Sequence, residues 1–391
     1  MYKIQTLNKM AATSASCFDG AAYAVSDAET TPDAILVRSE KLHDKQFNSE
    51  LLCIARAGAG TNNIPSARCA EEGIVVFNTP GANAEAVKEL ALAGMLLASR
   101  DILGGIEWVN SIAGTPDVAA QVEKGKSAFV GPELQGKILG VIGLGAIGIK
   151  LANDAQALGM GVMGYDPYMS VSAAHRLSPA VCVTTDIAQI YKTCDYISIH
   201  VPYIADGANA THHYVNSGTI AQMKRGVVIL NLARAELVSD DDIIAALADG
   251  QVSKYVTDFP NEKTAGAKGI IAIPHLGAST PESEERCAFM AAEQTINYIE
   301  NGNIVNSVNL PALTAPRAAG TARVCVIFKS APDAIALLTA AVSANAELAA
   351  TASATRGDYG YAIFDVKSAP SELKAAVEAV GGAIRVRVLE A

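Results

Sequence analysis

Three side chains that could carry acid–base chemistry, Arg234, Glu262 and His275, each follow a hydrophobic run typical of a β-strand. They lie in segments 231–234, 258–262 and 274–280. A histidine can accept a proton from a hydroxyl group, and a neighbouring carboxylate favours the charged form of its imidazole. An arginine can hold an anionic group of a substrate through paired hydrogen bonds. Beside a nicotinamide ring, this set suits the oxidation of an alcohol.

Each of these residues also has a simpler interpretation. Arg234 could form an ion pair on the surface, Glu262 could be a solvated charge in a loop, and His275 could cap a helix expected at 281–300. The catalytic interpretation is favoured because all three would lie at the same edge of one sheet.

A glycine-rich turn supplies a place for the nicotinamide cofactor. The segment GLGAIG at 143–148 follows the hydrophobic run 138–142 and opens an amphipathic run at 147–158. Its glycines permit a tight turn and let backbone N–H groups approach a pyrophosphate at a helix N-terminus. Asp166 ends the next hydrophobic run and would accept hydrogen bonds from the adenosine ribose. Its charge would repel a 2′-phosphate, so we expect NAD rather than NADP; the alternative is an ordinary turn with Asp166 as a strand-end cap.

The elements that would position these residues alternate between strand and helix. Nine runs are almost continuously hydrophobic, which is typical of a parallel sheet covered on both faces. They are 35–38, 51–56, 75–78, 138–142, 161–166, 195–200, 227–231, 253–258 and 270–273. Helical runs such as 147–158 and 240–249 lie between them. The alternation predicts an α/β protein with two doubly wound, Rossmann-like or flavodoxin-like parallel sheets.

The C-terminal residues follow a different pattern. After a proline-rich linker around 311–321 come a strand (323–328), a helix (332–347), a hairpin (349–366), a helix (371–380) and a strand (384–389). This βαββαβ order is typical of a small α+β, ferredoxin-like module. The last strand alternates between apolar and charged residues, which predicts a sheet with one face in water.

Composition limits the kinds of function. The chain has 391 residues and a formal net charge of −10, and half of its residues are hydrophobic, as in globular proteins of two or three domains. The acidic balance argues against a nucleic-acid or membrane-surface partner. Seven scattered cysteines without a CxxC pair, and no apolar segment typical of a signal peptide or membrane span, predict free thiols, no metal site and a cytoplasmic location.

Residues 30–310 resemble the NAD-dependent D-2-hydroxyacid dehydrogenase family. The resemblance rests on GLGAIG at 143–148, NLARAELV at 231–238, DFPNE at 258–262 and PHLGAST at 274–280. Within the family, ILVRS at 35–39, CIARAGAGTNNI at 53–64, FNTPGANAEAVKEL at 77–90 and GNIVNSVNLP at 302–311 are most similar to members that act on D-3-phosphoglycerate. The resemblance implies NAD-dependent oxidation of that small anionic substrate to 3-phosphohydroxypyruvate, which begins L-serine synthesis.

The resemblance assigns roles to individual residues. It implies Arg234 as the substrate-orienting arginine, Glu262 as the carboxylate paired with histidine, and His275 as the acid/base. The implied cofactor contacts are Gly143, Gly145, Ala146, Ile147, Gly148, Asp166, His200, Val201, Pro202, Ala233, Asp258 and Gly277. The implied substrate contacts are Arg38, Ser39, Arg56, Ala57, Gly58, Arg234 and His275.

The implied organisation is a discontinuous substrate-binding domain (1–83 and 281–310), an NAD-binding domain (84–280) and an ACT-like regulatory domain (318–391). Substrate is expected in the cleft between the first two. The family implies a homodimer or homotetramer, and Trp108 is expected in a dimer contact or in loop packing. Lys124 and Lys126 are expected in a polar loop, where they could meet a neighbouring subunit's substrate.

Three departures from the family pattern qualify these roles. Ala235 replaces the usual glycine after the arginine, and the spacing from Asp258 to Glu262 is one residue shorter than usual. The segment 328–333, FKSAPD, lacks the usual serine-binding residues, which argues against feedback inhibition by serine. Two alternatives remain: another D-2-hydroxyacid dehydrogenase, acting on hydroxypyruvate, glyoxylate or D-lactate, or an NAD-sensing binding protein of the same fold.

Overall fold

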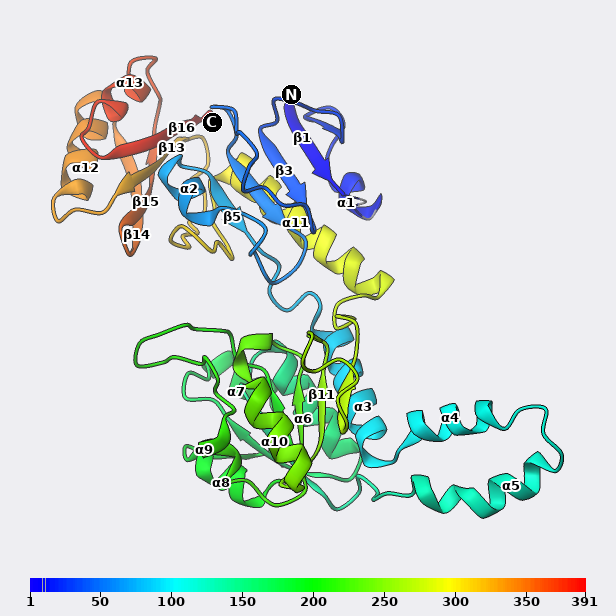
Figure 1. Ribbon diagram of the computed structural model, residues 1–391. Helices are drawn as coiled ribbons and strands as arrows, with labels where there is room; N and C mark the ends of the chain where they lie inside the picture. Colours follow the sequence, from blue (N-terminus) through cyan, green and yellow to red (C-terminus); the bar gives the residue numbers. More distant parts are fainter. Residues whose placement is uncertain (9, 11) are drawn as a thin grey trace. The chain divides into compact units, whose positions relative to one another are not determined.

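The computed structural model describes residues 1–8, 10 and 12–391. The chain forms two compact units (Figure 1): residues 1–83 together with 281–391, and residues 84–280. Among the described residues, no helix has both the length and the apolar character needed to cross a bilayer.

The first unit contains a five-stranded parallel sheet. Its strands are β1 (Tyr2–Leu7), β2 (Tyr23–Ser26), β3 (Ala34–Val37), β4 (Cys53–Arg56) and β5 (Val75–Phe77). They lie in the order β2-β1-β3-β4-β5, which is the flavodoxin-like form of a doubly wound sheet. The helices of this part are α1 (Ala12–Ser16), α2 (Ser66–Glu71) and α11 (Pro281–Asn301).

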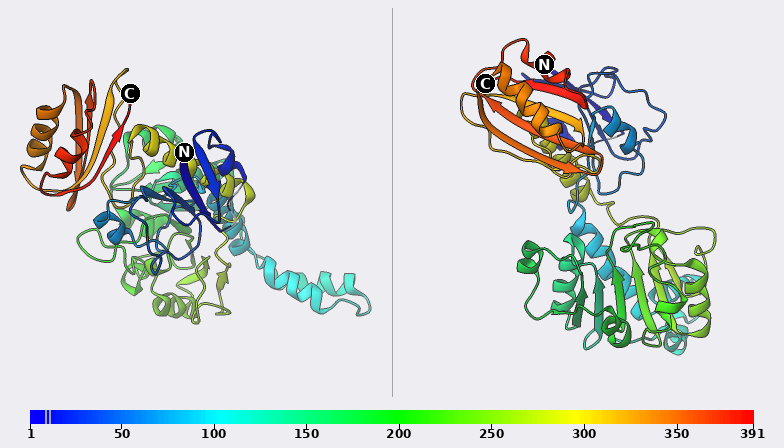
Figure 2. Two further views of the ribbon diagram at one scale, coloured as in Figure 1. Left: turned by 90° about the horizontal axis from the view of Figure 1, so that it is seen from above. Right: turned by 90° about the vertical axis from the view of Figure 1, so that its left-hand side faces the viewer.

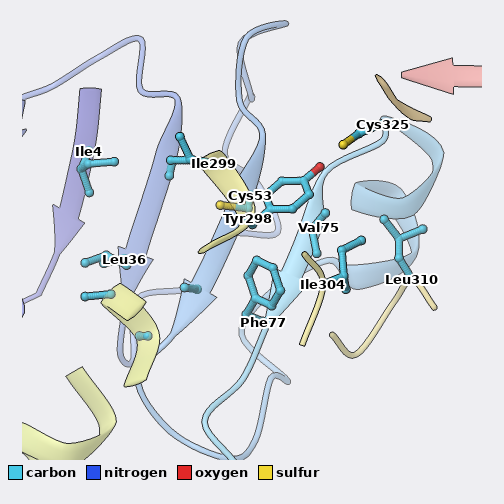
Figure 3. Packing of buried hydrophobic residues seen from close by; sticks show 14 of the residues in the cluster. Ile4, Leu36, Cys53, Val75, Phe77, Tyr298, Ile299, Ile304, Leu310 and Cys325 are labelled. Atoms are coloured by element: carbon cyan, nitrogen blue, oxygen red, sulfur yellow. The ribbon is translucent and has the colours of Figure 1, made fainter. Parts of the chain in front are cut away.

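Both faces of this sheet are covered, as the continuous hydrophobic runs predict. In β3, Ile35 packs into the cluster that contains Cys69 of α2, whereas Leu36 packs into the cluster that contains Ala291 and Tyr298 of α11. Figure 3 shows the second cluster, in which residues of the first sheet meet α11. Alternate residues of one strand therefore contribute to separate cores, and both must be apolar.

The second unit contains a seven-stranded parallel sheet. Its strands are β6 (Ile138–Ile142), β7 (Gly161–Tyr165), β8 (Cys182–Val183), β9 (Tyr196–Ile199), β10 (Val227–Asn231), β11 (Val252–Thr257) and β12 (Ile270–Ala272). The order β12-β11-β10-β9-β6-β7-β8 reverses at β6, as in dinucleotide-binding folds. One face carries α3 (Ala84–Ser99), α6 (Ala146–Ala157) and α7 (Val171–Arg176); the other carries α8 (Ile187–Thr193), α9 (Ser217–Ile220) and α10 (Asp240–Asp249).

An arm of two helices extends from the second unit (Figure 1). It consists of α4 (Ile102–Ser111), α5 (Val118–Gly125) and a 3₁₀ turn, η1 (Lys126–Phe129). The expectation of a polar loop around Lys124 and Lys126 was therefore wrong. The misleading signal was the polar composition of 121–127, which in the structure spans the end of α5 and the start of η1, neither of which has a buried residue.

The C-terminal module has the predicted βαββαβ order. It consists of β13 (Ala322–Lys329), α12 (Ala334–Asn345), β14 (Leu348–Arg356), β15 (Tyr359–Val366), α13 (Leu373–Glu378) and β16 (Ala383–Leu389). The strands form an antiparallel sheet in the order β14-β15-β13-β16. Figure 2 shows α12 and α13 on one face of this sheet, where they cover a core of their own.

The other face of the module's sheet is covered where β13 and β15 run, which corrects the prediction of a face in water made from β16. Cys325, Ile327, Tyr361 and Ile363 belong to the same core cluster as β1, β3 and β4 of the first sheet. The charged positions of β16 serve the junction as well, because Arg387 donates hydrogen bonds to the carbonyl oxygens of the last turns of α11. The charge alternation in β16 predicted a polar face. It could not show that α11 of the same chain supplies hydrogen-bond acceptors for Arg387.

The sequence missed the three strands with the weakest hydrophobic signal, β1, β2 and β8. β1 contains exposed and half-buried polar residues, and β8 has only two residues. The other nine strands of the two parallel sheets lie where predicted, within two residues at each end. The predicted α/β fold with a small α+β module is confirmed.

Candidate active site

The glycine turn after β6 has the geometry of a phosphate-binding loop. Gly143 has φ +95°, and a Cβ there would lie 2.6 Å from the carbonyl oxygen of His200. A side chain at Gly148 would overlap the Gly143 carbonyl, so these two glycines are required by packing. Gly145 is the N-cap of α6, and a Cβ there would meet no atom within 4 Å. The helix N-terminus therefore faces open space, where a pyrophosphate would meet its N–H groups.

Asp166 follows β7 and is held beside this turn. Its Oδ2 accepts a hydrogen bond from the Leu144 N–H at 2.9 Å, and its Oδ1 accepts one from the Tyr168 N–H at 2.9 Å. A carboxylate has about four acceptor positions, so two remain for ribose hydroxyls. The carboxylate thus both fixes the glycine turn and offers a ribose-binding group.

A cavity of about 520 Å³ lies between the loops that follow β6, β7 and β9. Its volume is within the roughly 300–1,000 Å³ of small-molecule sites. It is lined by Gly143, Gly145, Tyr165, Asp166, Pro167, Tyr168, His200, Val201, Pro202, Ile204, Ala208, Asn209, Ala210, Thr211 and Tyr214. The glycine turn, Asp166 and the segment from His200 to Pro202, expected separately from the sequence, therefore share one cavity.

His200 forms part of the wall of this cavity in its neutral state. Burial lowers the pKa of its imidazole to about 4. Its Nε2 is 2.8 Å from the Ser198 hydroxyl, whereas its buried Nδ1 has no hydrogen-bond partner within the described residues. A neutral, unpartnered ring nitrogen suits a binding contact rather than proton transfer during catalysis.

Asn231 fixes the loop that carries Arg234, a role that the sequence did not reveal. Asn231 is fully buried at the end of β10, and its side-chain amide donates to the Arg234 carbonyl oxygen at 2.8 Å. Its side-chain oxygen accepts the N–H of Ala233 at 3.2 Å. The available signal was an amide residue that ends a hydrophobic strand just before the arginine. It holds Ala233 and Arg234 in the conformation that ends the strand.

Asp258 lies near two of the predicted catalytic residues, Arg234 and His275. It follows β11, it is 1% exposed, and its Oδ2 accepts the Gly277 N–H at 3.1 Å. Burial raises the pKa of the Asp258 carboxyl, while the Gly277 hydrogen bond and the nearby charges of His275 and Arg234 oppose that rise. Its Oδ1 is buried without a hydrogen-bond partner among the described residues.

His275 is held by its backbone and leaves its ring exposed. Its N–H donates to the Asp258 carbonyl oxygen at 3.1 Å, and its ring centroid lies 4.8 Å from that of Phe259. Its φ is +31°, an uncommon value for a residue with a side chain. Such strain costs about 1–3 kcal/mol and tends to occur at functional sites. The loops after β11 and β12 thus present the imidazole together.

Glu262 is the predicted residue that the structure does not bring into contact with His275. The loop after β11 forms a tight turn in which the Asn261 side-chain oxygen accepts the N–H groups of Lys263 and Thr264. Glu262 lies at the tip of that turn, exposed, and it has no ion pair or hydrogen bond within the described part of the chain.

The predicted substrate residues of the first unit share one edge of its sheet. Arg38 follows β3 and Arg56 ends the neighbouring strand β4, and the Arg56 Nε donates to the Arg38 carbonyl oxygen at 3.0 Å. The Arg56 guanidinium lies against Gly58, where any side chain would overlap it. Arg38 itself forms a 2.7 Å ion pair with Glu284 of α11. Ala57 is buried between Arg56 and Gly58, whereas Ser39 is exposed.

Comparison with known proteins identifies the family of the chain. Residues 92–278 match the family described as "D-isomer specific 2-hydroxyacid dehydrogenase, NAD binding domain". The chain is 32% identical over 356 residues to D-3-phosphoglycerate dehydrogenase of Haemophilus influenzae, covering 87% of this chain and 82% of that one. The chain belongs to the D-2-hydroxyacid dehydrogenase family. The resemblance inferred from the motifs is thereby confirmed.

Two further relatives are longer than this chain. It is 33% identical to D-3-phosphoglycerate dehydrogenase of Synechocystis and 34% identical to that of Methanocaldococcus jannaschii, covering 72% and 67% of this chain. It spans about half the length of these two relatives, 50% and 48%. The NAD⁺-bound 3-phosphoglycerate dehydrogenase of Entamoeba histolytica has the same fold, with a TM-score of 0.62 and 24% identity, over 80% of this chain and 99% of that one.

The residues of this dehydrogenase fit NAD, the cofactor that the matched family confirms. The open space at Gly145 can receive the pyrophosphate, and Asp166 has acceptor positions for a ribose. The buried, unpartnered Oδ1 of Asp258 can accept an N–H of the nicotinamide carboxamide. Backbone donors for the pyrophosphate and carboxylate acceptors for the ribose and the carboxamide are thus available for three parts of the dinucleotide.

Proposed function

We propose that this protein oxidises D-3-phosphoglycerate to 3-phosphohydroxypyruvate, the first step of L-serine synthesis. The observation that carries the proposal is the position of Arg234 and His275 around the buried carboxylate of Asp258, in the unit that holds the glycine turn. A base, a cation and a cofactor-orienting acceptor together suit the oxidation of a hydroxy acid. The choice of a phosphorylated substrate is supported by the names of the relatives and by Arg38 and Arg56.

Each residue of the site has a separate proposed role in the reaction. Bound NAD⁺ supplies the acceptor for the hydride that leaves C2 of the substrate. An imidazole nitrogen of His275 takes the hydroxyl proton, and the Arg234 guanidinium holds the carboxylate and the carbonyl oxygen that develops at C2. Asp258 orients the nicotinamide through its carboxamide. Acid–base assistance of this kind is worth about 10²–10⁴-fold in rate.

Glu262 is proposed as the carboxylate that stabilises the charged form of His275. Because Glu262 is exposed at the tip of its turn, that pairing requires the turn after Asn261 to rearrange. We therefore expect Glu262→Gln to lower kcat less than His275→Ala does.

The three regions of the chain receive separate proposed roles. Residues 1–83 and 281–310 would bind the substrate phosphate and carboxylate through Arg38, Arg56 and the amides near Ala57 and Gly58. Residues 84–280 would bind NAD. Residues 318–391 would be an ACT-like regulatory module. Its departure from the serine-binding pattern at 328–333 predicts little or no response of the enzyme to L-serine.

We propose that the arm formed by α4 and α5 joins two copies of the chain, in a homodimer or a larger homo-oligomer. Leu103, Ile106 and Val109 of α4 are exposed, and neither helix has a buried residue. Exposed apolar side chains on a projecting element are typical of association surfaces. Light scattering after chromatography should show that Ile106→Asp lowers the molar mass to that of one chain. The thiols of Cys53, Cys69, Cys182, Cys194, Cys287 and Cys325 are free, which fits a reducing cytoplasm.

The test of the proposed function is a substrate panel followed by NADH absorbance. We expect reduction of 3-phosphohydroxypyruvate to have a far higher kcat/KM than reduction of hydroxypyruvate, glyoxylate or pyruvate. A preference for an unphosphorylated acid would make the protein another dehydrogenase of the family. Inactivity toward the whole panel together with tight NADH binding would make it an NAD sensor.

A further inference from the structure

A hydrogen bond joins two loops at the edge of the cavity in the second unit. The Tyr168 hydroxyl donates to the Asn209 side-chain oxygen. Tyr168 lies in the loop after β7, and Asn209 lies in the loop after β9. Because β7 and β9 pair with opposite sides of β6, this bond spans the end of β6, where the glycine turn begins. Both residues line the cavity.

Asn209 lies in a loop whose two ends are joined by hydrogen bonds. The Thr211 hydroxyl donates to the Pro202 carbonyl oxygen and accepts the Ile204 N–H, each at 2.7 Å. The Thr211 N–H returns a hydrogen bond to the Ile204 carbonyl oxygen at 2.8 Å. Thr211 is buried, so these bonds are shielded from water. These bonds close the base of the loop between Ile204 and Thr211, which carries Asn209.

The Tyr168 ring depends on Asn209 in this loop. Its backbone N–H is held by Asp166, but its side chain is on the surface, with 72% of the residue exposed. Within the described residues, Asn209 is the hydrogen-bond partner of its hydroxyl. Without that bond, an exposed tyrosine would occupy several rotamers, and binding a ligand against its ring would require it to be ordered first.

We propose that Tyr168 is a cofactor-binding residue that contacts the adenosine half of NAD, and that Asn209 is a positioning residue that holds its ring over the cavity before the cofactor arrives. The inference rests on the proposed contact of Asp166 with the adenosine ribose, because Tyr168 is only two residues away. Holding one side chain in its bound conformation saves the ordering cost of that side chain, which corresponds to about two- to tenfold in affinity.

The test measures dissociation constants for NADH and for ADP-ribose, which contains the adenosine half but no nicotinamide. Tyr168→Phe and Asn209→Ala should each weaken both ligands by about two- to tenfold, and the double variant should be no weaker than either single one. The loss should fall on KM for NAD⁺ more than on kcat. Tyr203→Phe is the matched control, because its hydroxyl pairs with His212 in the same loop region but it does not line the cavity.

Several outcomes of these measurements would contradict the inference. Unchanged ADP-ribose affinity in both Tyr168→Phe and Asn209→Ala would overturn it, as would additive losses in the double variant or an equal loss in Tyr203→Phe. Tyr168→Ala removes the ring itself and should weaken ADP-ribose more than Tyr168→Phe does; an equal effect would contradict contact by the ring. Because ADP-ribose binding needs no hydroxy acid, an inactive wild-type protein would refute the proposed reaction without affecting this result.

Discussion

Two buried carboxylates, Asp365 in the C-terminal module and Asp258 in the candidate active site, differ in how their oxygens are hydrogen-bonded. Asp365 is 2% exposed, and both of its oxygens accept hydrogen bonds from Arg323, at 2.7 and 3.0 Å. Arg323 also donates to three backbone carbonyl oxygens, those of Asn301, Ala315 and Pro316. Asp258 is equally buried, but one of its oxygens has no partner within the described residues.

The comparison separates a structural junction from a binding site. At the junction, the buried ion pair is satisfied, and it ties β13 and β15 to the end of α11 and to the linker that follows. At the site, the fold tolerates an unpaired acceptor and a strained His275, which are costs that only a bound ligand would offset. Among the described residues of the second unit, the buried side-chain atoms without a hydrogen-bond partner belong to His200 and Asp258, both of which we assign to the cofactor site.

The largest expected effect concerns His275 in the candidate active site. His275→Ala should lower kcat by about 10²–10⁴-fold, because the variant has no group to accept the hydroxyl proton. NADH affinity should remain close to that of the wild type, since the cavity that we assign to the adenosine lies in other loops of the unit. Steady-state kinetics and fluorescence titration measure the two quantities. Turnover near the wild-type rate would remove His275 from the mechanism.

A pair of matched substitutions tests the comparison itself. Asp365→Asn should lower the free energy of unfolding of the first unit by about 3–5 kcal/mol, because it leaves the buried Arg323 without a compensating charge. Asp258→Asn should not lower the stability of the second unit, and it should weaken NADH binding. Urea denaturation and NADH titration of both variants check this; equal destabilisation by the two would contradict the assigned difference.

The pH dependence follows from the same carboxyl group. Burial raises the pKa of Asp258 above its ordinary value, so its ionised form penalises the folded state. That penalty disappears as the pH falls through the raised pKa, and the folded second unit gains stability relative to its unfolded chain. In Asp258→Asn this gain should be absent. Comparing the unfolding of the wild type and the variant between about pH 4 and pH 7 measures the difference.

The smallest of these effects concerns cofactor choice. Asp166→Ser should weaken NADH by about 10–100-fold, because a hydrogen bond to a charged acceptor contributes about 1.5–3 kcal/mol. The ratio of NADPH to NADH affinity should rise, since the charge that repels a 2′-phosphate is gone. Titration with both cofactors measures the ratio, and a ratio equal to that of the wild type would show that Asp166 does not face the ribose.

Sequence patterns predicted the structure of a segment correctly where a single local signal, such as a hydrophobic run or a glycine spacing, determined it. Continuous hydrophobic runs located most strands of the parallel sheets, and the glycine spacing located the turn that lies beside Asp166. The arm was not predicted, because its helices bury no residue and α5 in particular is polar. The role of Asn231, which holds its own loop, and the proposed role of Asn209, which depends on Tyr168 in another loop, were also missed.

By itself, the sequence determined the two doubly wound sheets, the α+β module, the family and the residue types available for catalysis, because each depends on local patterns of hydrophobicity, glycine and charge. Only the tertiary structure decided that Arg387 of β16 contacts the end of α11, that Asp258 lies near both His275 and Arg234, and that Glu262 is exposed. These outcomes depend on packing between segments distant in the chain, which no local pattern encodes.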